Sequence, residues 1–130
     1  MEEAFLRTEM LLGRAAMERL AGANVAVFGL GGVGSWCAEA LARSGVGTLT
    51  LVDQDTVGVT NLNRQIQATR ATLGQPKAEA MARRVGEIAP ACRVFPVAER
   101  YEADTRDRFF AAGYDYVADF IDLVSCKLDL

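Results

Sequence analysis

The chain alternates between short apolar runs and segments whose apolar residues recur at helical spacing. Apolar runs of about five residues predict buried strands, and apolar positions three or four residues apart predict helices. The predicted strands are 24–28, 48–52, 93–97 and 116–120. The predicted helices are 7–20, 35–44, 76–89 and 105–112, with a further helix opening at 123.

Strands that alternate with helices favour a parallel sheet with right-handed crossovers. The pattern therefore predicts an α/β fold, a Rossmann-like doubly wound sheet of order 3-2-1-4 that follows an N-terminal helix. The segment 123–130 has no helix stop signal, and the fourth strand would leave an open apolar edge. We expect residues 1–130 to be the N-terminal part of one longer domain without an internal boundary. The alternative is a naturally short domain whose edge is covered by a partner chain.

The first predicted strand runs directly into a glycine-rich turn, Gly29-Leu-Gly31-Gly32-Val-Gly34. In such a turn the first glycine permits the tight bend, the second lets backbone approach a phosphate, and the third lets the helix pack closely. Asp53 ends the next apolar run, about 20 residues further on, where a carboxylate can reach a ribose hydroxyl. This context predicts a nucleotide site, and the alternative is a purely structural glycine turn.

One basic residue lies within the long polar segment 53–73, and another lies at the start of the helix that follows it. Arg64 is either an ordinary surface arginine or, beside a phosphate turn, a fork for phosphate oxygens. Pro76 suits the first helical position, which places Lys77 in the first turn of the helix. A cation there opposes the helix dipole, so Lys77 is either a solvated lysine or a cation aimed at a bound anion.

The fourth predicted strand ends with two carboxylates, Asp119 and Asp122. The carboxyl ends of parallel strands face the ligand crevice, and Mg²⁺ prefers carboxylates together with phosphates. We therefore expect Asp122 to hold magnesium or contact the nucleotide, whereas the alternative is that either aspartate caps a following helix.

Composition narrows the classes of function. Hydrophobic residues make up 51% of the chain and charged residues 24%, as in a single globular domain. The chain has no histidine, which excludes histidine catalysis and the usual zinc sites within it. Three scattered cysteines without a CxxC pair favour a reducing cytoplasm, and no apolar run approaches the ~20 residues of a membrane span. The net charge of −3 gives no basic excess for nucleic acid.

Five motifs occur together and in order: Gly29-Leu-Gly-Gly-Val-Gly34, Asp53-Gln-Asp55, Asn61-Leu-Asn-Arg64-Gln65, Pro76-Lys77 and Asp119-Phe-Ile-Asp122. This set resembles the ThiF/MoeB/HesA superfamily of ubiquitin-activating-enzyme-like adenylating enzymes, over nearly the whole chain. The resemblance implies that Arg64 and Lys77 hold the triphosphate of ATP, that Asp122 binds Mg²⁺, and that Arg7 reaches the nucleotide of a partner subunit in a homodimer. The expected nucleotide-binding residues are Gly29, Gly31, Gly32, Gly34, Asp53, Asp55, Asn61, Arg64 and Lys77.

Further stretches are similar to the tRNA threonylcarbamoyladenosine dehydratases: Arg7-Thr-Glu-Met, Gly34-Ser-Trp36, Arg43-Ser-Gly-Val-Gly47 and Asn63-Arg-Gln-Ile66. One departure is Gln67, where that family has histidine. The resemblance implies a cytoplasmic enzyme that adenylates a carboxylate on a tRNA base, with Arg64, Lys77, Asp122 and Arg7 as catalytic residues. The alternative substrate is the C-terminus of a small sulfur-carrier protein. An NAD-dependent oxidoreductase and a non-catalytic nucleotide-binding subunit also stay open.

Overall fold

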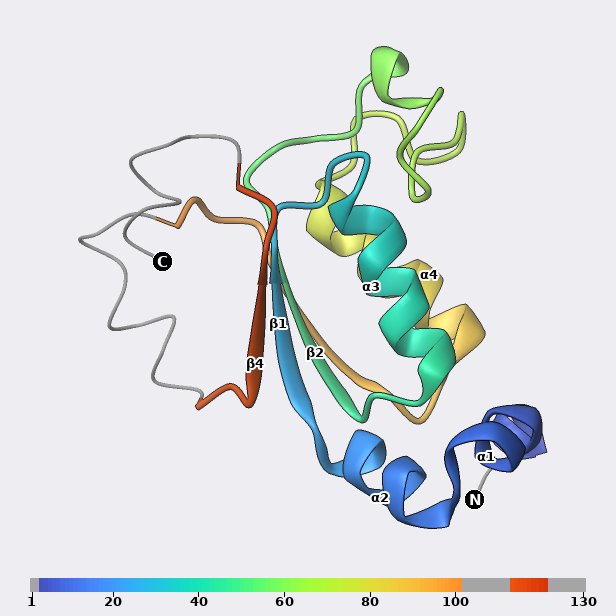
Figure 1. Cartoon of the computed structure of the whole chain (residues 1–130). Coiled ribbons are helices and arrows are strands. Elements are labelled where there is room, and N and C mark those ends of the chain that lie inside the picture. Colours follow the sequence, from blue (N-terminus) through green and yellow to red (C-terminus); the bar gives the residue numbers. More distant parts are fainter. Residues whose placement is uncertain (1–2, 102–112, 122–130) are drawn as a thin grey trace.

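The computed structural model describes residues 3–101 and 113–121, which form a parallel sheet covered by helices (Figure 1). Two helices precede the sheet, and two more alternate with its first three strands. The helices are the short 3-10 helix η1 (Glu3–Phe5), α1 (Leu6–Leu12), α2 (Arg14–Gly22), α3 (Gly34–Ser44), the 3-10 helix η2 (Val59–Asn61) and α4 (Lys77–Ile88). The strands are β1 (Asn24–Phe28), β2 (Thr48–Val52), β3 (Arg93–Val97) and β4 (Tyr116–Asp119).

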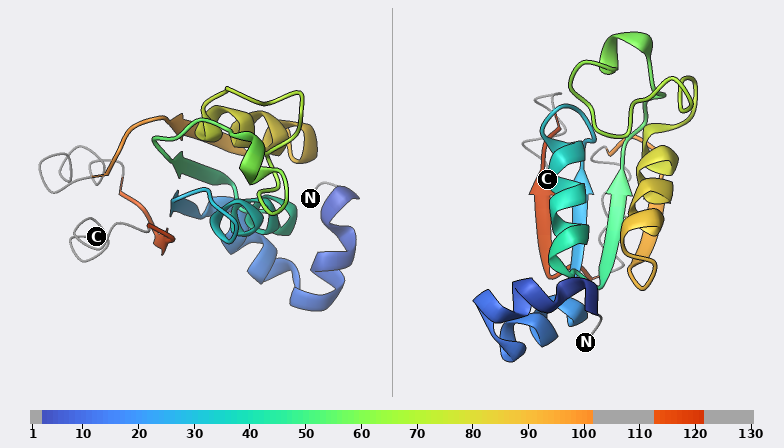
Figure 2. Two further views of the ribbon diagram at one scale, coloured as in Figure 1. Left: turned by 90° about the horizontal axis from the view of Figure 1, so that it is seen from above. Right: turned by 90° about the vertical axis from the view of Figure 1, so that its right-hand side faces the viewer.

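The sheet has the order β3-β2-β1-β4, and every neighbouring pair is parallel, which confirms the predicted topology. Phe28 at the end of β1 pairs with Val52 of β2 and with Asp119 of β4, so these strands end at one edge. Figure 2 shows α3 and α4 on one face of the sheet, with the glycine turn and the polar loop at that edge. The register therefore brings the ends of the strands to one place, as ligand crevices of open parallel sheets require.

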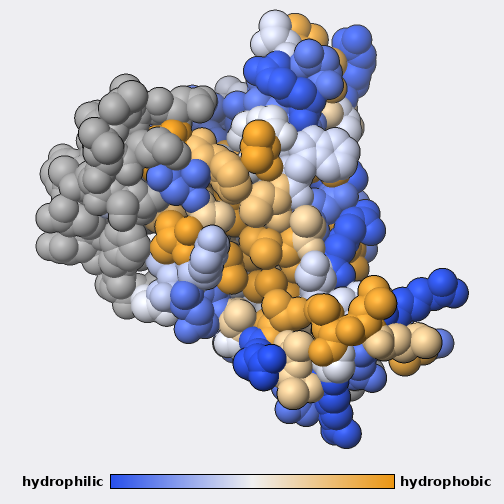
Figure 3. Space-filling model, in the orientation of Figure 1, coloured by the Kyte–Doolittle hydropathy of each residue, from blue (hydrophilic) through white to orange (hydrophobic). Residues whose placement is uncertain are grey.

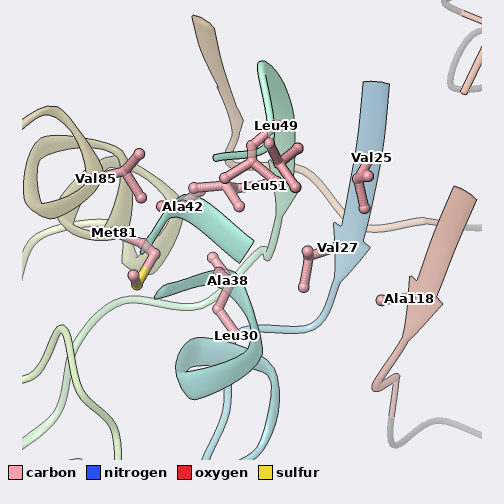
Figure 4. Close-up of a cluster of buried hydrophobic side chains, with 12 residues drawn as sticks. Val25, Val27, Leu30, Ala38, Ala42, Leu49, Leu51, Met81, Val85 and Ala118 are labelled. Carbon is pink, nitrogen blue, oxygen red and sulfur yellow. The ribbon is translucent and has the colours of Figure 1, made fainter. Parts of the chain in front are cut away.

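The main core lies between the sheet and helices α3 and α4 (Figure 4). Strands β1 and β2 contribute Val27, Leu49 and Leu51, which are fully buried, and α4 adds Met81 and Val85. A second buried cluster contains Ala26, Phe28, Val52 and Tyr101. The central strands are thus covered on both faces, which explains the continuous apolar run Val25–Phe28 in β1 and the burial of Thr50 among the leucines of β2.

The prediction of one N-terminal helix over 7–20 is wrong in one respect, because the structure has two helices there, α1 and α2, separated by Gly13. Gly13 has a φ of +88°, in the left-handed region that glycine enters without strain, and this breaks the helix. Met17 of α2 is buried, whereas α1 exposes its apolar residues. Figure 3 shows apolar residues gathered over these helices, which lie at the end of the sheet opposite the glycine turn (Figure 1).

Several predicted boundaries shift slightly. Helix α4 begins at Lys77, and Pro76 is its N-cap with an extended ψ of 133°, so the proline is not the first helical residue. Strand β4 ends at Asp119, one residue earlier than predicted. The predicted helices 105–112 and 123–130 lie outside the described residues. None of the helices in the described part of the chain has the length and apolarity needed to cross a membrane.

Candidate functional site

The glycine turn after β1 requires glycine at two positions for different reasons. Gly29 has a φ of +93°, and a Cβ atom there would lie 2.5 Å from the backbone oxygen of Phe120. A Cβ atom on Gly34 would lie 1.8 Å from the backbone oxygen of Gly29, so only glycine lets α3 start this close to the turn. At Gly31 the nearest atom is the Nε2 of Gln65, 4.0 Å away, which leaves the backbone accessible to a ligand.

Asp53 ties the end of β2 to this turn. One carboxylate oxygen accepts a hydrogen bond of 2.7 Å from the Leu30 N–H, and the other accepts one of 2.8 Å from the Asp55 N–H. An ionised carboxylate has about four acceptor sites, so these bonds leave capacity for a ligand hydroxyl. The structure therefore gives Asp53 a local role in addition to the ribose contact predicted for it.

The polar loop is fastened to the glycine turn by side chains of both segments. The Ser35 hydroxyl donates to the Gly31 carbonyl at 2.6 Å and accepts the Ile66 N–H at 3.2 Å. The buried Gln67 amide donates to the Leu30 carbonyl at 2.9 Å, and the Trp36 indole N–H donates to the carbonyl of Arg64 at 2.8 Å. Three of these bonds join residues 28 to 37 positions apart in the chain, and they hold Arg64 beside the turn.

Arg64 is exposed and lies over Gly32, since a Cβ atom there would be 3.4 Å from its Cγ and Cδ. Its guanidinium donates to the Thr60 carbonyl at 3.0 Å and to the Asn63 side chain at 2.9 Å. Both acceptors are neutral and solvent-exposed, so the charge of Arg64 is not neutralised by them. Asn61 accepts the Gly58 N–H at 2.8 Å and so shapes the loop that carries this arginine.

Lys77 is the first residue of α4 and is only 7% exposed. Its ammonium lies 3.9 Å from the Asp55 carboxylate, a long ion pair whose acidic partner is mostly in solvent. The alternative of a solvated lysine does not hold, because the side chain is buried. A buried cation at a helix N-terminus is unfavourable by itself, because the helix dipole favours an anion there. The arrangement can therefore accept an additional anion.

These residues surround one cleft of about 880 Å³ at the carboxyl edge of the sheet. All of the predicted nucleotide-binding residues line it: Gly29, Gly31, Gly32, Gly34, Asp53, Asp55, Asn61, Arg64 and Lys77. Two predicted catalytic residues are not brought there by the described structure. Asp122 lies outside the described residues, and Arg7 is an exposed residue of α1, at the other end of the sheet (Figure 1).

Other residues line the cleft that sequence reasoning missed, among them Gln65, Glu99, Arg100 and Tyr101. Tyr101 is buried, and its ring meets that of Phe28 edge to face at 5.2 Å. A signal for residues 99–101 was present, because they follow β3, and strand ends in parallel sheets face the crevice. Gln65 was noted only within a motif, and nothing in the sequence shows that its side chain is buried in the cleft wall.

Carboxylates also mark the end of β4. Asp119 lines the cleft, and its Oδ1 accepts the N–H of Ile121 at 3.1 Å, which turns the chain directly after the strand. Within 3–101 and 113–121, no three cysteine or acidic side chains gather in a way that could hold a metal ion. A magnesium site built by several protein carboxylates is therefore not found in this part of the chain.

A buried ion pair links the two helices that begin at the cleft. Glu39 of α3 accepts hydrogen bonds from Arg84 of α4 and, at 3.1 Å, from Arg43 of its own helix. Burial alone raises the pKa of the Glu39 carboxyl, but the hydrogen bonds from Arg84 and Arg43 outweigh it, so the pKa lies below its usual range. Burial raises the pKa of the Cys37 and Cys92 thiols, which makes both poor nucleophiles.

Comparison with known proteins gives consistent findings. The family described as the ThiF family matches residues 5–130. The tRNA threonylcarbamoyladenosine dehydratase of Bacillus subtilis (strain 168) is 47% identical over 126 residues, which are 97% of this chain and 50% of that protein. The molybdopterin-synthase adenylyltransferase of Salmonella typhimurium is 42% identical over 113 residues, 87% of this chain and 45% of that protein.

The fold is also found in a solved structure. A crystal structure of the Escherichia coli tRNA N6-threonylcarbamoyladenosine dehydratase TcdA in complex with ATP superposes with a TM-score of 0.96 at 48% identity. The match covers 98% of this chain and 53% of that one. The chain thus spans about half the length of the relatives it matches.

Proposed function

Because the chain belongs to the ThiF family, we propose that it supplies the ATP-binding part of a single adenylation domain, in an enzyme that activates a carboxylate. The carboxylate attacks the α-phosphate of ATP, an acyl adenylate forms, and pyrophosphate leaves. The observation that carries the proposal is the cleft that collects the nine predicted nucleotide-binding residues at one edge of the sheet. The ATP complex of the structurally similar dehydratase TcdA supports the choice of ligand.

The roles of the residues follow from charge and position. The backbone at Gly31 and Gly32 would face the phosphates, and Asp53 would accept a ribose hydroxyl. Arg64 and the buried Lys77 would offset the charge that moves onto the leaving pyrophosphate. The nucleophile is already an anion, so this step requires no general base, in agreement with a chain that has no histidine.

Magnesium is part of the proposal. The end of β4 offers carboxylate oxygen, the ligand that Mg²⁺ prefers, since Asp119 lines the cleft and Asp122 follows shortly after. We propose that Asp122 binds the ion together with phosphate oxygens. When bound, the ion would supply further neutralisation of the phosphates.

We propose a carboxylate on a modified tRNA adenosine, threonylcarbamoyladenosine, as the substrate, with ring closure and loss of water as the outcome. The name of the Bacillus relative, at 47% identity, supports this choice. The similarity to a molybdopterin-synthase adenylyltransferase keeps the C-terminus of a small sulfur-carrier protein as the alternative. The proposed location is the cytoplasm, where both kinds of substrate occur.

The proposed assembly is a homodimer in which Arg7 acts on the partner's nucleotide. Helix α1 lies at the far end of the sheet from the cleft, so Arg7 is remote from the nucleotide site of its own chain (Figure 1). The same helix exposes Leu6, Met10, Leu11 and Leu12, with Leu11 86% exposed. An apolar helix face of this kind favours contact with another protein surface.

One experiment with the full-length protein tests ligand and substrate together. ATP with Mg²⁺ should raise the melting temperature more than NAD or NADP does, since two cations flank the glycine turn. Incubation with ATP, Mg²⁺ and bulk tRNA, followed by digestion to nucleosides, should then lower the mass of threonylcarbamoyladenosine by one water. Stabilisation by NAD equal to that by ATP would exclude adenylation. If AMP release required a sulfur-carrier protein and did not depend on tRNA, the substrate would be the sulfur-carrier protein and not the tRNA.

A further inference from the structure

Gln65 has an unusual environment in the cleft. It lines the cleft wall directly after Arg64, and only 5% of its surface is exposed. Its Oε1 is buried without a hydrogen-bond partner, whereas its Nε2, which makes no hydrogen bond within the described part of the chain, is not a buried atom. The amide therefore has a buried, unpaired oxygen and an accessible N–H group without a protein acceptor, at the edge of the space that a ligand would fill.

Such an arrangement is unfavourable for the free protein. Burying an unpaired amide costs free energy, because its hydrogen bonds to water are lost and not replaced. An apolar side chain of similar size, such as methionine, would pack in the same space without this cost. Folding alone therefore gives no reason for glutamine at this position, whereas a ligand that accepts its N–H group does.

Gln67 provides the contrast two residues further on. It is also buried, at 2% exposure, but its Nε2 donates to the Leu30 carbonyl at 2.9 Å and so joins the loop to the glycine turn. Gln67 does not line the cleft. The Oε1 of each glutamine is buried without a hydrogen-bond partner, so the two residues differ in Nε2, which the protein uses in Gln67 and leaves at the cleft in Gln65.

The position of the amide indicates which part of a ligand it meets. The Nε2 of Gln65 is the nearest atom to the place where a side chain at Gly31 would stand, 4.0 Å away. Gly31 leaves its backbone open to a ligand, and in glycine-rich turns of this kind the middle glycine faces the phosphates. A phosphate that approaches Gly31 therefore approaches Gln65. Nε2 already lies on the side of Gly31, so its N–H group can donate to such a phosphate without a half-turn of the amide.

We propose that Gln65 is a nucleotide-binding residue whose carboxamide N–H donates to a phosphate oxygen, beside Arg64 and Lys77. The inference rests on the proposed ATP site. As a neutral donor, Gln65 binds phosphate without adding charge to a cleft that already holds two cations. The buried Oε1 lowers the stability of the free protein whether or not nucleotide is bound, whereas the N–H group gains its acceptor only when the phosphate arrives.

The test is a comparison of Gln65→Met with Gln67→Met in the full-length protein, with ATP–Mg²⁺ and adenosine as probes in calorimetric titrations. Gln65→Met should leave the melting temperature of the free protein unchanged or higher, and should raise the Kd for ATP at least tenfold, about 1.4 kcal/mol. Its Kd for adenosine should stay unchanged. Gln67→Met should lower the melting temperature of the free protein, because the Leu30 carbonyl loses its donor. Gln65→Glu should weaken ATP binding more than Gln65→Met, because its charge repels phosphate.

The possible failures are distinguishable. If the unmodified protein does not bind ATP, the proposed function and this inference both fall. If it binds ATP and Gln65→Met binds equally well, only the role of Gln65 is wrong. A lower melting temperature for free Gln65→Met would make the residue structural. Equal losses of ATP and adenosine affinity would exclude a phosphate contact.

Discussion

At the carboxyl end of the strands, the molecule buries polar side chains, whereas at the opposite end the N-terminal helices expose apolar ones. Ser35, Gln65, Gln67 and Lys77 are all buried around the cleft. Helix α1 instead presents leucine and methionine to solvent. Each arrangement is unfavourable until something completes it: an anion in the first case, and a protein surface in the second. The cleft end is therefore suited to an anionic ligand, and the end formed by α1 is suited to contact with a protein surface.

Substitution of Gly34 should have the largest effect at the cleft end. In Gly34→Ala the new Cβ would lie 1.8 Å from the Gly29 carbonyl oxygen, and relief requires the glycine turn to move. We expect a loss of about 2–4 kcal/mol in the free energy of unfolding, together with loss of ATP binding. Denaturant titration and ATP calorimetry on the full-length protein measure both.

Gly47→Ala is the matched variant at the other end, since its Cβ would lie equally close to the Ala21 oxygen of α2. It should destabilise the protein to a similar extent, while its folded fraction keeps its ATP affinity. Gly31→Ala meets no atom closer than 4.0 Å, and it should keep its stability but bind ATP more weakly. If folded Gly34→Ala bound ATP with normal affinity, the glycine turn would not be part of the nucleotide site.

The second-largest effect on function should come from removal of either cationic side chain of the cleft. Lys77→Ala and Arg64→Ala should each lower ATP-dependent turnover at least tenfold, about 1.4 kcal/mol in the transition state. Both side chains have neutral or weak partners in the free protein, so the melting temperature should change little. Steady-state rates with saturating substrate measure the effect. Unchanged turnover in one variant would show that this cation does not contact the phosphates.

A mixing experiment tests whether α1 of one subunit reaches the cleft of another subunit in a homodimer. Arg7→Ala and Lys77→Ala subunits, each inactive alone, should recover part of the activity when they are mixed and allowed to exchange. Recovery requires that one intact site combines the first subunit's Lys77 with the second subunit's Arg7. If activity does not recover although subunits exchange, as shown by mass spectrometry, Arg7 does not act across an interface.

The smallest expected effect concerns Glu39, which joins α3 to α4 away from the cleft. Its pKa is lower in the folded state than in the unfolded chain, so its contribution is complete above the unfolded pKa of about 4.3 and is lost as the pH falls through the folded pKa. Glu39→Gln should cost about 1 kcal/mol at neutral pH. The difference should shrink in acid, as urea titrations at several pH values would show. A difference that does not depend on pH would exclude the ion pair as its cause.

Local signals account for what the sequence predicted well. The bounds of β1, β2 and β3 match the prediction. In β1 the reason is burial on both faces, which leaves the unbroken apolar pattern Val25–Phe28. The sheet order followed from the handedness of crossovers. The cleft followed as well, since Asp53, Lys77 and the glycines stand at strand ends or helix starts that a parallel sheet brings to one edge.

The sequence by itself therefore determined the family, the sheet and nine of the residues around the cleft. Only the tertiary structure decided the state of each side chain. It buries Lys77, bonds Asp53 to the Leu30 N–H, and gives the Nε2 of Gln67 a hydrogen bond that the Nε2 of Gln65 lacks within the described residues. The reason is physical: burial and hydrogen bonding depend on which segments meet across the fold, and residues about 30 positions apart carry no local signal of that meeting.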